Sequence, residues 1–168
     1  MMAELDPENE RIRGYLQAQA AKNTIDQIKA KVQESVDALH AAANAFSVDE
    51  CVLRPAGESW TPVACLSHCI ECNLAAAQKV IYVALTGELP ADEERSWPAD
   101  RDGLLAAHAE GMDSLYIHLA DAEPAYFLNT KWEHEMFGDL NWREWFLFLR
   151  IHNMDHARQM EAMKAALA

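Results

Sequence analysis

The most decisive stretch of the sequence lies at residues 141–167, which read NWREWFLFLRIHNMDHARQMEAMKAAL. Asn141 followed by Glu144 is the pattern of a helix N-cap with its capping box. Apolar residues then recur at three- and four-residue steps, as on the buried face of an amphipathic helix. The members of this stripe are Trp142, Trp145, Leu149, Met160, Met163 and Leu167. The stretch therefore predicts a long C-terminal helix with one face in the core.

Two histidines, His152 and His156, lie on the same side of this predicted helix. At about 100° per residue, His156 falls within the apolar sector and His152 about 20° beyond its edge. An i, i+4 pair places both rings on one face, with β-carbons about 6 Å apart. Two rings so placed can bind one divalent ion at ~2.0–2.1 Å per nitrogen. Buried histidines also occur as structural residues that bond a backbone carbonyl, so the spacing alone leaves both interpretations open.

Three further helices are predicted upstream. A long periodic run over roughly residues 8–46 indicates the first, with a bend expected near Gly14 or Asn23. The second is predicted over about 62–86, and the third over about 99–122. Clear start and stop signals flank the second, namely Thr61 as N-cap, Pro62 in the first turn and Gly87 after the last turn.

The segment 123–140 is expected to be irregular, because it shows neither helical periodicity nor a strand pattern. Four helices joined by loops predict an all-α fold, a four-helix bundle. At 168 residues the chain has the size of one domain. We therefore expect a single domain over 1–168, with residues 1–7 as a flexible N-terminal tail.

The charge balance is strongly acidic, with 14 Lys and Arg against 27 Asp and Glu and a net charge of −13. Nucleic-acid backbones and anionic membrane surfaces both attract basic side chains. The charge thus argues against nucleic acid and against a membrane surface as partners. The N-terminal residues lack the apolar core of a signal peptide, and no apolar run approaches the ~20 residues of a membrane span.

Three of the four cysteines, Cys65, Cys69 and Cys72, lie within eight residues of one predicted helix. This clustering differs from the spaced framework of a secreted disulfide-rich domain and favours a reducing, cytoplasmic location. Cys69 and Cys72 form a C-x-x-C pair, but the strands that flank a thioredoxin-like motif are missing. We expect small buried side chains here, with metal or redox involvement as the alternative.

A third metal ligand would have to come from another helix, and His68 is the best candidate. The periodicity places it about 160° from the stripe formed by Leu66, Ile70 and Leu74. His68 can therefore reach the interior only if the neighbouring side of its helix, with Cys65 and Cys72, also faces inward. The spacing permits this orientation without requiring it.

The order of several short motifs resembles the DinB/YfiT-like superfamily over roughly residues 12–166. These motifs are Trp60-Thr61-Pro62, Leu66-Ser67-His68, Gly138 through Trp142, Trp145, and His152-x-x-x-His156-Ala-Arg-Gln159. The resemblance implies a four-helix bundle of DinB type in which three histidines hold a divalent metal ion. Carried over residue by residue, these ligands are His68, His152 and His156. The identity of the metal (Zn, Ni, Fe or Mn) stays open.

The same resemblance implies a small-molecule substrate and two classes of reaction. Members of the superfamily look like metal-dependent hydrolases, or like transferases and isomerases that use a low-molecular-weight thiol such as bacillithiol or mycothiol. Glu71, one turn from His68, is a candidate base or orienting partner, although a glutamate at such a position is commonly just solvated. The alternatives are a non-catalytic metal- or small-molecule-binding bundle, such as a stress-related partner protein, and a bundle with purely structural histidines. The broad apolar surface of the second helix also allows a homodimer.

Overall fold

The computed structural model describes residues 6–168, and its longest helix, α5 (Trp142–Leu167), begins as the sequence predicts. The side-chain oxygen of Asn141 accepts the backbone N–H groups of Arg143 and Glu144. In return, the Glu144 carboxylate accepts the N–H of Asn141 at 2.9 Å. This reciprocal capping box satisfies N–H groups that the first turn leaves without partners. The predicted start of the last helix is confirmed.

The first predicted helix is two helices, α1 (Pro7–Lys22) and α2 (Ile25–Asn44). Asn23 is extended, with φ −91° and ψ 148°, and α2 restarts at a second capping box between Thr24 and Gln27. The bend expected near Asn23 is therefore a complete break, because the capping residues favour a new helix start over continuation. Of the tail predicted for residues 1–7, residues 1–5 lie outside the described part of the chain, whereas residues 6 and 7 begin α1.

Helix α3 (Pro62–Thr86) has the predicted bounds. The Thr61 hydroxyl caps its start by accepting the N–H of Ala64 at 3.2 Å, and Gly87 ends it with φ 77°, a left-handed conformation that favours glycine. A short 3-10 turn, η1 (Glu50–Val52), precedes it, and α4 (Arg101–Leu119) follows after a long connection. The third predicted helix is thus a few residues shorter than expected.

The segment 123–140 is not wholly irregular, which corrects the sequence-based expectation. It contains an antiparallel hairpin of β1 (Lys131–His134) and β2 (Gly138–Asn141), in which Trp132 pairs with Leu140. Each strand has only four residues, too few for alternation to show in the sequence. The ring of Trp132 stacks on Trp145 of α5, with centroids 5.3 Å apart, so the hairpin is held by tertiary packing.

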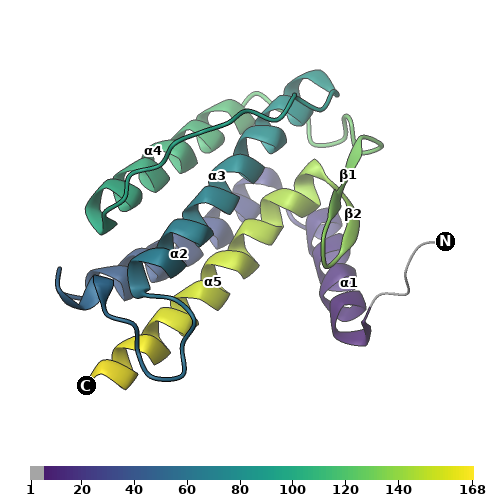
Figure 1. Ribbon diagram of the computed structural model, residues 1–168. Helices are drawn as coiled ribbons and strands as arrows, with labels where there is room; N and C mark the ends of the chain where they lie inside the picture. The colour runs from purple at the N-terminus through teal and green to yellow at the C-terminus, as the bar shows by residue number, and fades with distance from the viewer. Residues whose placement is uncertain (1–5) are drawn as a thin grey trace.

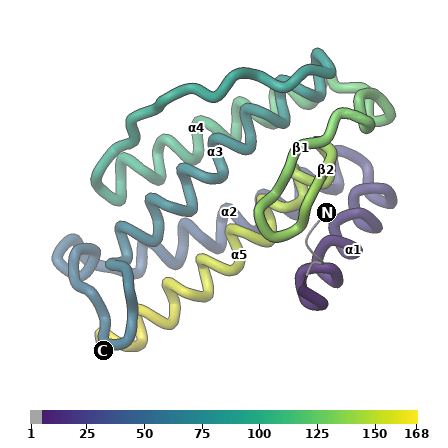
Figure 2. The backbone as a smooth tube through the Cα atoms, turned by 45° about the vertical axis from the view of Figure 1, so that its right-hand side comes forward, coloured from purple at the N-terminus to yellow at the C-terminus, as the bar shows by residue number. Residues whose placement is uncertain are grey.

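Helices α2, α3, α4 and α5 lie alongside one another, and α1 with the hairpin packs against the first part of α5 (Figure 1). The views of Figures 1 and 2 agree that α3 and α5 are neighbours and that the C-terminus lies beside the connection from α2 to α3. There Nζ of Lys164 lies 2.7 Å from each carboxylate oxygen of Glu50. The mostly helical class is confirmed, with five helices and a two-stranded sheet over residues 6–168.

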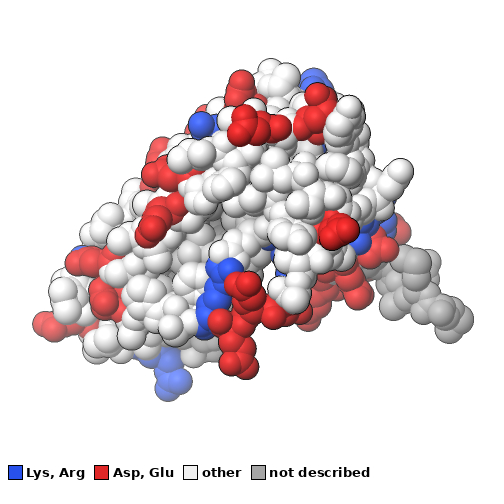
Figure 3. Space-filling model, turned by 90° about the horizontal axis from the view of Figure 1, so that it is seen from above, with Lys and Arg blue, Asp and Glu red and all other residues white. Residues whose placement is uncertain are grey.

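The outer surface is rich in carboxylates, as Figure 3 shows for one face, where acidic side chains are spread widely and basic ones are few. Among the helices of residues 6–168, none combines the length and apolar character that a membrane crossing requires.

Candidate metal centre

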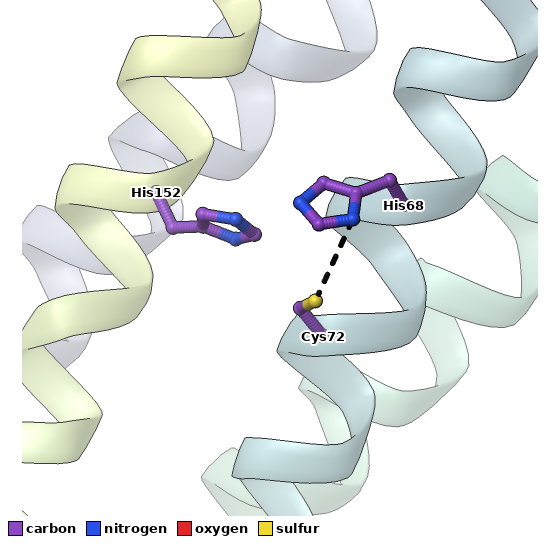
Figure 4. A group of neighbouring side chains, drawn as sticks. All are labelled: His68, Cys72 and His152. Atoms are coloured by element: carbon purple, nitrogen blue, oxygen red, sulfur yellow. Dashed lines mark hydrogen bonds between the residues drawn. The ribbon is translucent and has the colours of Figure 1, made fainter. Parts of the chain in front are cut away.

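The structure brings His68 of α3 together with His152 and His156 of α5. The rings of His68 and His152 face one another across the gap between the two helices (Figure 4). The centroid of the His68 ring lies 5.6 Å from that of His152 and 5.2 Å from that of His156, and the latter two are 4.6 Å apart. Three imidazoles bound to one ion at ~2.0–2.1 Å would have centroids ~4.5–5.6 Å apart for bond angles of about 90–120°. The spacing of the ring centroids fits a shared ion, whereas the sets of donor atoms that lie within 4.8 Å of one another join His68 with His152 and Cys72, and His156 with His152 and Cys69.

Two ring nitrogens of α5 lie close together: Nε2 of His152 is 3.1 Å from Nε2 of His156. Two nitrogen ligands of one ion at ~2.1 Å are separated by about 3.0–3.4 Å for angles of 90–109°. The distance between the two Nε2 atoms thus equals that expected for neighbouring ligands of one ion.

The hydrogen bonds of the other two ring nitrogens determine which tautomers are present. Nδ1 of His152 lies 3.0 Å from Oδ1 of Asn73, and Nδ1 of His156 lies 3.1 Å from Oε1 of Gln159. Amide oxygens only accept hydrogen bonds, so each Nδ1 must be the protonated nitrogen. Both Nε2 atoms then present lone pairs to each other, an arrangement that a cation between them would stabilise. Metal-binding histidines commonly have their second nitrogen held by such an acceptor.

Burial keeps the imidazoles of His152 and His156 neutral. It lowers the pKa of His152 to about 3, with repulsion from His156 and His68 in the same direction. The pKa of His156 is also lowered, again mainly by burial. Since a metal ion binds the neutral ring, protons compete weakly with a metal at this site near neutral pH.

Asn73 belongs to a buried polar network that sequence reasoning missed. Its amide nitrogen donates to the side-chain oxygen of Asn153 and lies 3.3 Å from Nε2 of His108. Nδ1 of His108 is in turn 3.0 Å from Nε2 of His40, which is half-buried. Asn73, His108 and Asn153 have no exposed surface. The sequence does contain a signal for this network, because Asn73 lies among apolar residues of α3, four residues after Cys69 and three before Ala76.

The cysteines of α3 differ in their surroundings. The Cys65 thiol donates to Oε1 of Gln159 at 3.4 Å, and the Cys69 thiol to Oδ1 of Asn153 at 3.7 Å. Burial raises the pKa of Cys65 to about 12 and that of Cys69 well above its ordinary value. These two thiols are neutral and buried, in line with the structural interpretation of the sequence. Cys72, in contrast, is exposed.

Sulfur atoms nevertheless lie close to the histidine nitrogens. Two sets of donor atoms lie within 4.8 Å of one another, and each pairs two histidines with a cysteine. The sets are His68, Cys72 and His152, and Cys69, His152 and His156. His152 belongs to both, which makes it the centre of the cluster. In Figure 4, Sγ of Cys72 lies below the His68 ring, 4.0 Å from its Nδ1.

The cluster opens into a cavity of about 450 Å³, which is lined by His68 and His152 together with the hairpin and the first turns of α5. A second cavity, of about 630 Å³, lies between α3 and the connection to α4. Glu71 lines this second cavity and accepts a hydrogen bond from the Ser67 hydroxyl at 2.7 Å. The structure thus gives Glu71 a local partner other than His68.

A mostly helical fold in which histidines from two adjacent helices, α3 and α5, meet at the mouth of a cavity defines the class: a helical protein with a candidate metal centre. The chain belongs to the DinB superfamily, whose family model matches residues 31–160. The matched range contains His68, Asn73, His152, His156 and Gln159. No curated protein and no solved structure gives a significant match.

Proposed function

We propose that this protein is a metal-dependent enzyme in which His68, His152 and His156 hold one divalent ion, with Zn, Ni, Fe and Mn as candidates. The observation that carries the proposal is the 3.1 Å separation of the two Nε2 atoms on α5. Both of these rings have their Nδ1 atoms engaged with amide oxygens. The arrangement leaves the lone pairs of two Nε2 atoms close together, and the His68 ring lies 5.6 Å from the His152 ring and 5.2 Å from the His156 ring between centroids, near enough to be proposed as the third ligand.

Three protein ligands leave a coordination position open, where a bound ion lowers the pKa of a water or thiol and so makes a nucleophile near neutral pH. The residues of the chain then orient the reactants. Asn73 and Gln159 fix the His152 and His156 rings, and the cavity beside His68 and His152 receives the substrate. Its volume of about 450 Å³ suits a small molecule. We propose hydrolysis, or transfer or isomerisation with a low-molecular-weight thiol, as the reaction class.

The surface charge supports a small molecule over nucleic acid as the partner. With a net charge of −13, the chain would repel a phosphate backbone. Figure 3 shows no continuous basic patch on the face it presents.

Metal analysis of protein purified without a polyhistidine tag tests the proposal. We expect about one equivalent of metal in the wild type and a loss of stoichiometric metal in His156→Ala, since three nitrogens are needed to hold the ion. His118→Ala is the matched control, because His118 is an exposed histidine on α4. A wild-type metal content in His156→Ala would show that the assignment is wrong.

A substrate panel then tests the enzymatic part. Protein reloaded with Zn²⁺, Ni²⁺ or Mn²⁺ is assayed on esters, amides and thiol conjugates, with His156→Ala as the background. Turnover that depends on the added ion supports the proposal. Stoichiometric metal without turnover on any member of the panel would instead support the non-catalytic metal-binding alternative.

A further inference from the structure

The cavity beside the candidate metal centre is built from segments far apart in the sequence. His68 and Cys72 come from α3, Ile12 comes from α1, and the remaining walls come from the hairpin and α5. Its volume of about 450 Å³ lies in the range of small-molecule sites. Because His68 and His152 are part of its lining, a molecule bound here lies next to the proposed ion.

Aromatic rings form a continuous wall from the hairpin to the metal centre. Trp132 stacks on Trp145 with an interplanar angle of 5°, and Trp145 contacts Phe148 edge-on at 5.5 Å between centroids. Phe148 in turn stacks on His152 at 5.4 Å. A wall of this kind favours a ligand with a flat or aliphatic apolar body, which buries area against the rings.

His134 on β1 supplies a polar group within this apolar wall. Its ring packs against Phe137 and Phe148, with centroids 4.5 Å and 4.4 Å away. Nδ1 accepts the backbone N–H of Met136 at 3.1 Å, so the neutral ring carries its proton on Nε2. Burial lowers the pKa of His134 to about 4, which keeps the ring neutral at physiological pH. None of the described residues accepts a hydrogen bond from this Nε2–H, which leaves the donor available to a ligand.

The charged residues of the lining disfavour an anion. The lining contains three carboxylates, of Glu133, Glu135 and Asp155, and one amine, of Lys79. Nζ of Lys79 is already paired with Oδ1 of Asp92 at 2.7 Å. In the metal-free protein the cavity therefore has an excess of negative charge and no free cation in its described lining, so an anionic ligand would be repelled there.

We infer that this cavity binds a neutral small molecule with an aromatic or aliphatic body and a carbonyl oxygen, which accepts a hydrogen bond from Nε2 of His134. The inference rests on the proposed function, because it names the substrate class of the same site. A carbonyl compound held here places its body on the Trp145–Phe148 wall and its other end toward His68 and His152.

Binding of the neutral fluorescent ketone 6-propionyl-2-(dimethylamino)naphthalene (the ketone probe) to metal-free protein tests the inference. We expect saturable binding with a blue-shifted emission. His134→Phe keeps the packing but removes the hydrogen-bond donor, so it should lower the affinity for the ketone probe by about 3- to 10-fold. Binding of 1-N-phenylnaphthylamine, which has no carbonyl, should not change. His134→Gln retains an N–H donor and should restore part of the affinity for the ketone probe.

Two tryptophans provide a matched pair of control variants. Trp132→Ala removes part of the cavity wall and should lower the affinity for both probes. Trp97→Ala should change neither affinity, because Trp97 lines the cavity between α3 and the connection to α4. The inference is overturned if His134→Phe leaves the affinity for the ketone probe unchanged, or if the two tryptophan variants have equal effects. Tighter binding of anionic 8-anilinonaphthalene-1-sulfonate than of the ketone probe would also overturn it.

The readout separates this inference from the proposed function, because probe binding is measured after chelation and needs no metal. A protein that binds the ketone probe as expected but holds no stoichiometric ion would refute the metal-dependent enzyme and leave the cavity assignment standing. A protein that holds the ion, but in which His134→Phe leaves the affinity for the ketone probe unchanged, would refute the cavity assignment and leave the metal site standing.

Discussion

Nδ1 of His152 on α5 lies 3.0 Å from Oδ1 of Asn73 on α3, a side chain with no exposed surface. The amide oxygen selects the Nδ1-protonated tautomer of the imidazole and fixes the plane of the ring. The packing of α3 on α5 thereby prepares Nε2 for a metal ion before any ion binds. Such pre-organisation reduces the entropy lost on binding.

Removal of the acceptor beside the second ring should lower metal affinity. In Gln159→Ala, Nδ1 of His156 loses its partner, and the affinity for Zn²⁺ is expected to fall by about 10- to 100-fold. Gln159→Glu keeps an acceptor and should bind at least as tightly as the wild type. Competition with a chromogenic chelator measures both, and Arg158→Ala, at the exposed neighbouring position, is the control. Equal affinities for the wild type and Gln159→Ala would contradict this role.

Asn73→Ala should destabilise the metal-free protein. The variant leaves Nδ1 of His152 and Oδ1 of Asn153 without their buried partner. Oδ1 of Asn153 keeps the Cys69 thiol as a donor, so one unsatisfied group at about 1–3 kcal/mol and one lost hydrogen bond at about 1 kcal/mol should lower the free energy of unfolding by about 2–4 kcal/mol in urea titrations. Asn129→Ala, at an exposed position, should change it by less than about 0.5 kcal/mol. Equal stabilities for the two variants would show that the network does not contribute.

Stability of the metal-free protein should decrease as the pH falls below about 6.5. Burial, with repulsion from His40 as a smaller cause, lowers the pKa of His108 to about 3. An unfolded histidine titrates near 6.5. Between these pH values the unfolded state binds more protons than the folded state. The contribution of His108 to the free energy of unfolding is therefore complete above about pH 6.5 and is lost toward pH 3. His134 and His152, whose pKa values are about 4 and about 3, act in the same direction.

Urea unfolding at pH 7, 6 and 5 measures this dependence on the wild type and on His108→Gln. The slope per histidine is at most roughly 1.4 kcal/mol per pH unit, so His108→Gln should flatten the dependence by up to that amount. His118→Gln replaces an exposed histidine of the same helix and should leave the slope as in the wild type. A slope that is the same in all three proteins would refute the burial effect.

Thiol labelling should distinguish Cys72 from the other cysteines. Cys72 is exposed, whereas Cys51, Cys65 and Cys69 are buried. Ellman's reagent should therefore modify about one thiol per chain rapidly in the native protein, and all four after unfolding in guanidinium chloride. Cys72→Ser should remove the rapid phase, and Cys51→Ser should retain it. Rapid labelling that survives in Cys72→Ser would be incompatible with this packing.

Local signals account for most of the helix boundaries. The Asn141–Glu144 capping box, Thr61 with Pro62, and Gly87 each act within one turn of the chain, so they can be recognised without knowledge of the fold. The break at Asn23 has a local signal too, the box of Thr24 and Gln27, but the apolar period continues across it and suggests one helix. The hairpin lacks such a signal, because its strands are short and depend on Trp145 for packing.

The residues of the candidate site also fall into two groups, those that local sequence predicts and those that only tertiary packing brings together. His152 and His156 are one helical turn apart, so helix geometry alone places their rings on one face. The position of His68 depends on the rotation of α3 about its axis. That rotation is set by the packing of Cys65 and Cys69 against α5, which no local rule contains. Asn73 and His134 likewise reach the site only through contacts between distant segments. Short-range steric and capping preferences thus specify the elements, whereas burial between α3, α5 and the hairpin specifies which side chains meet.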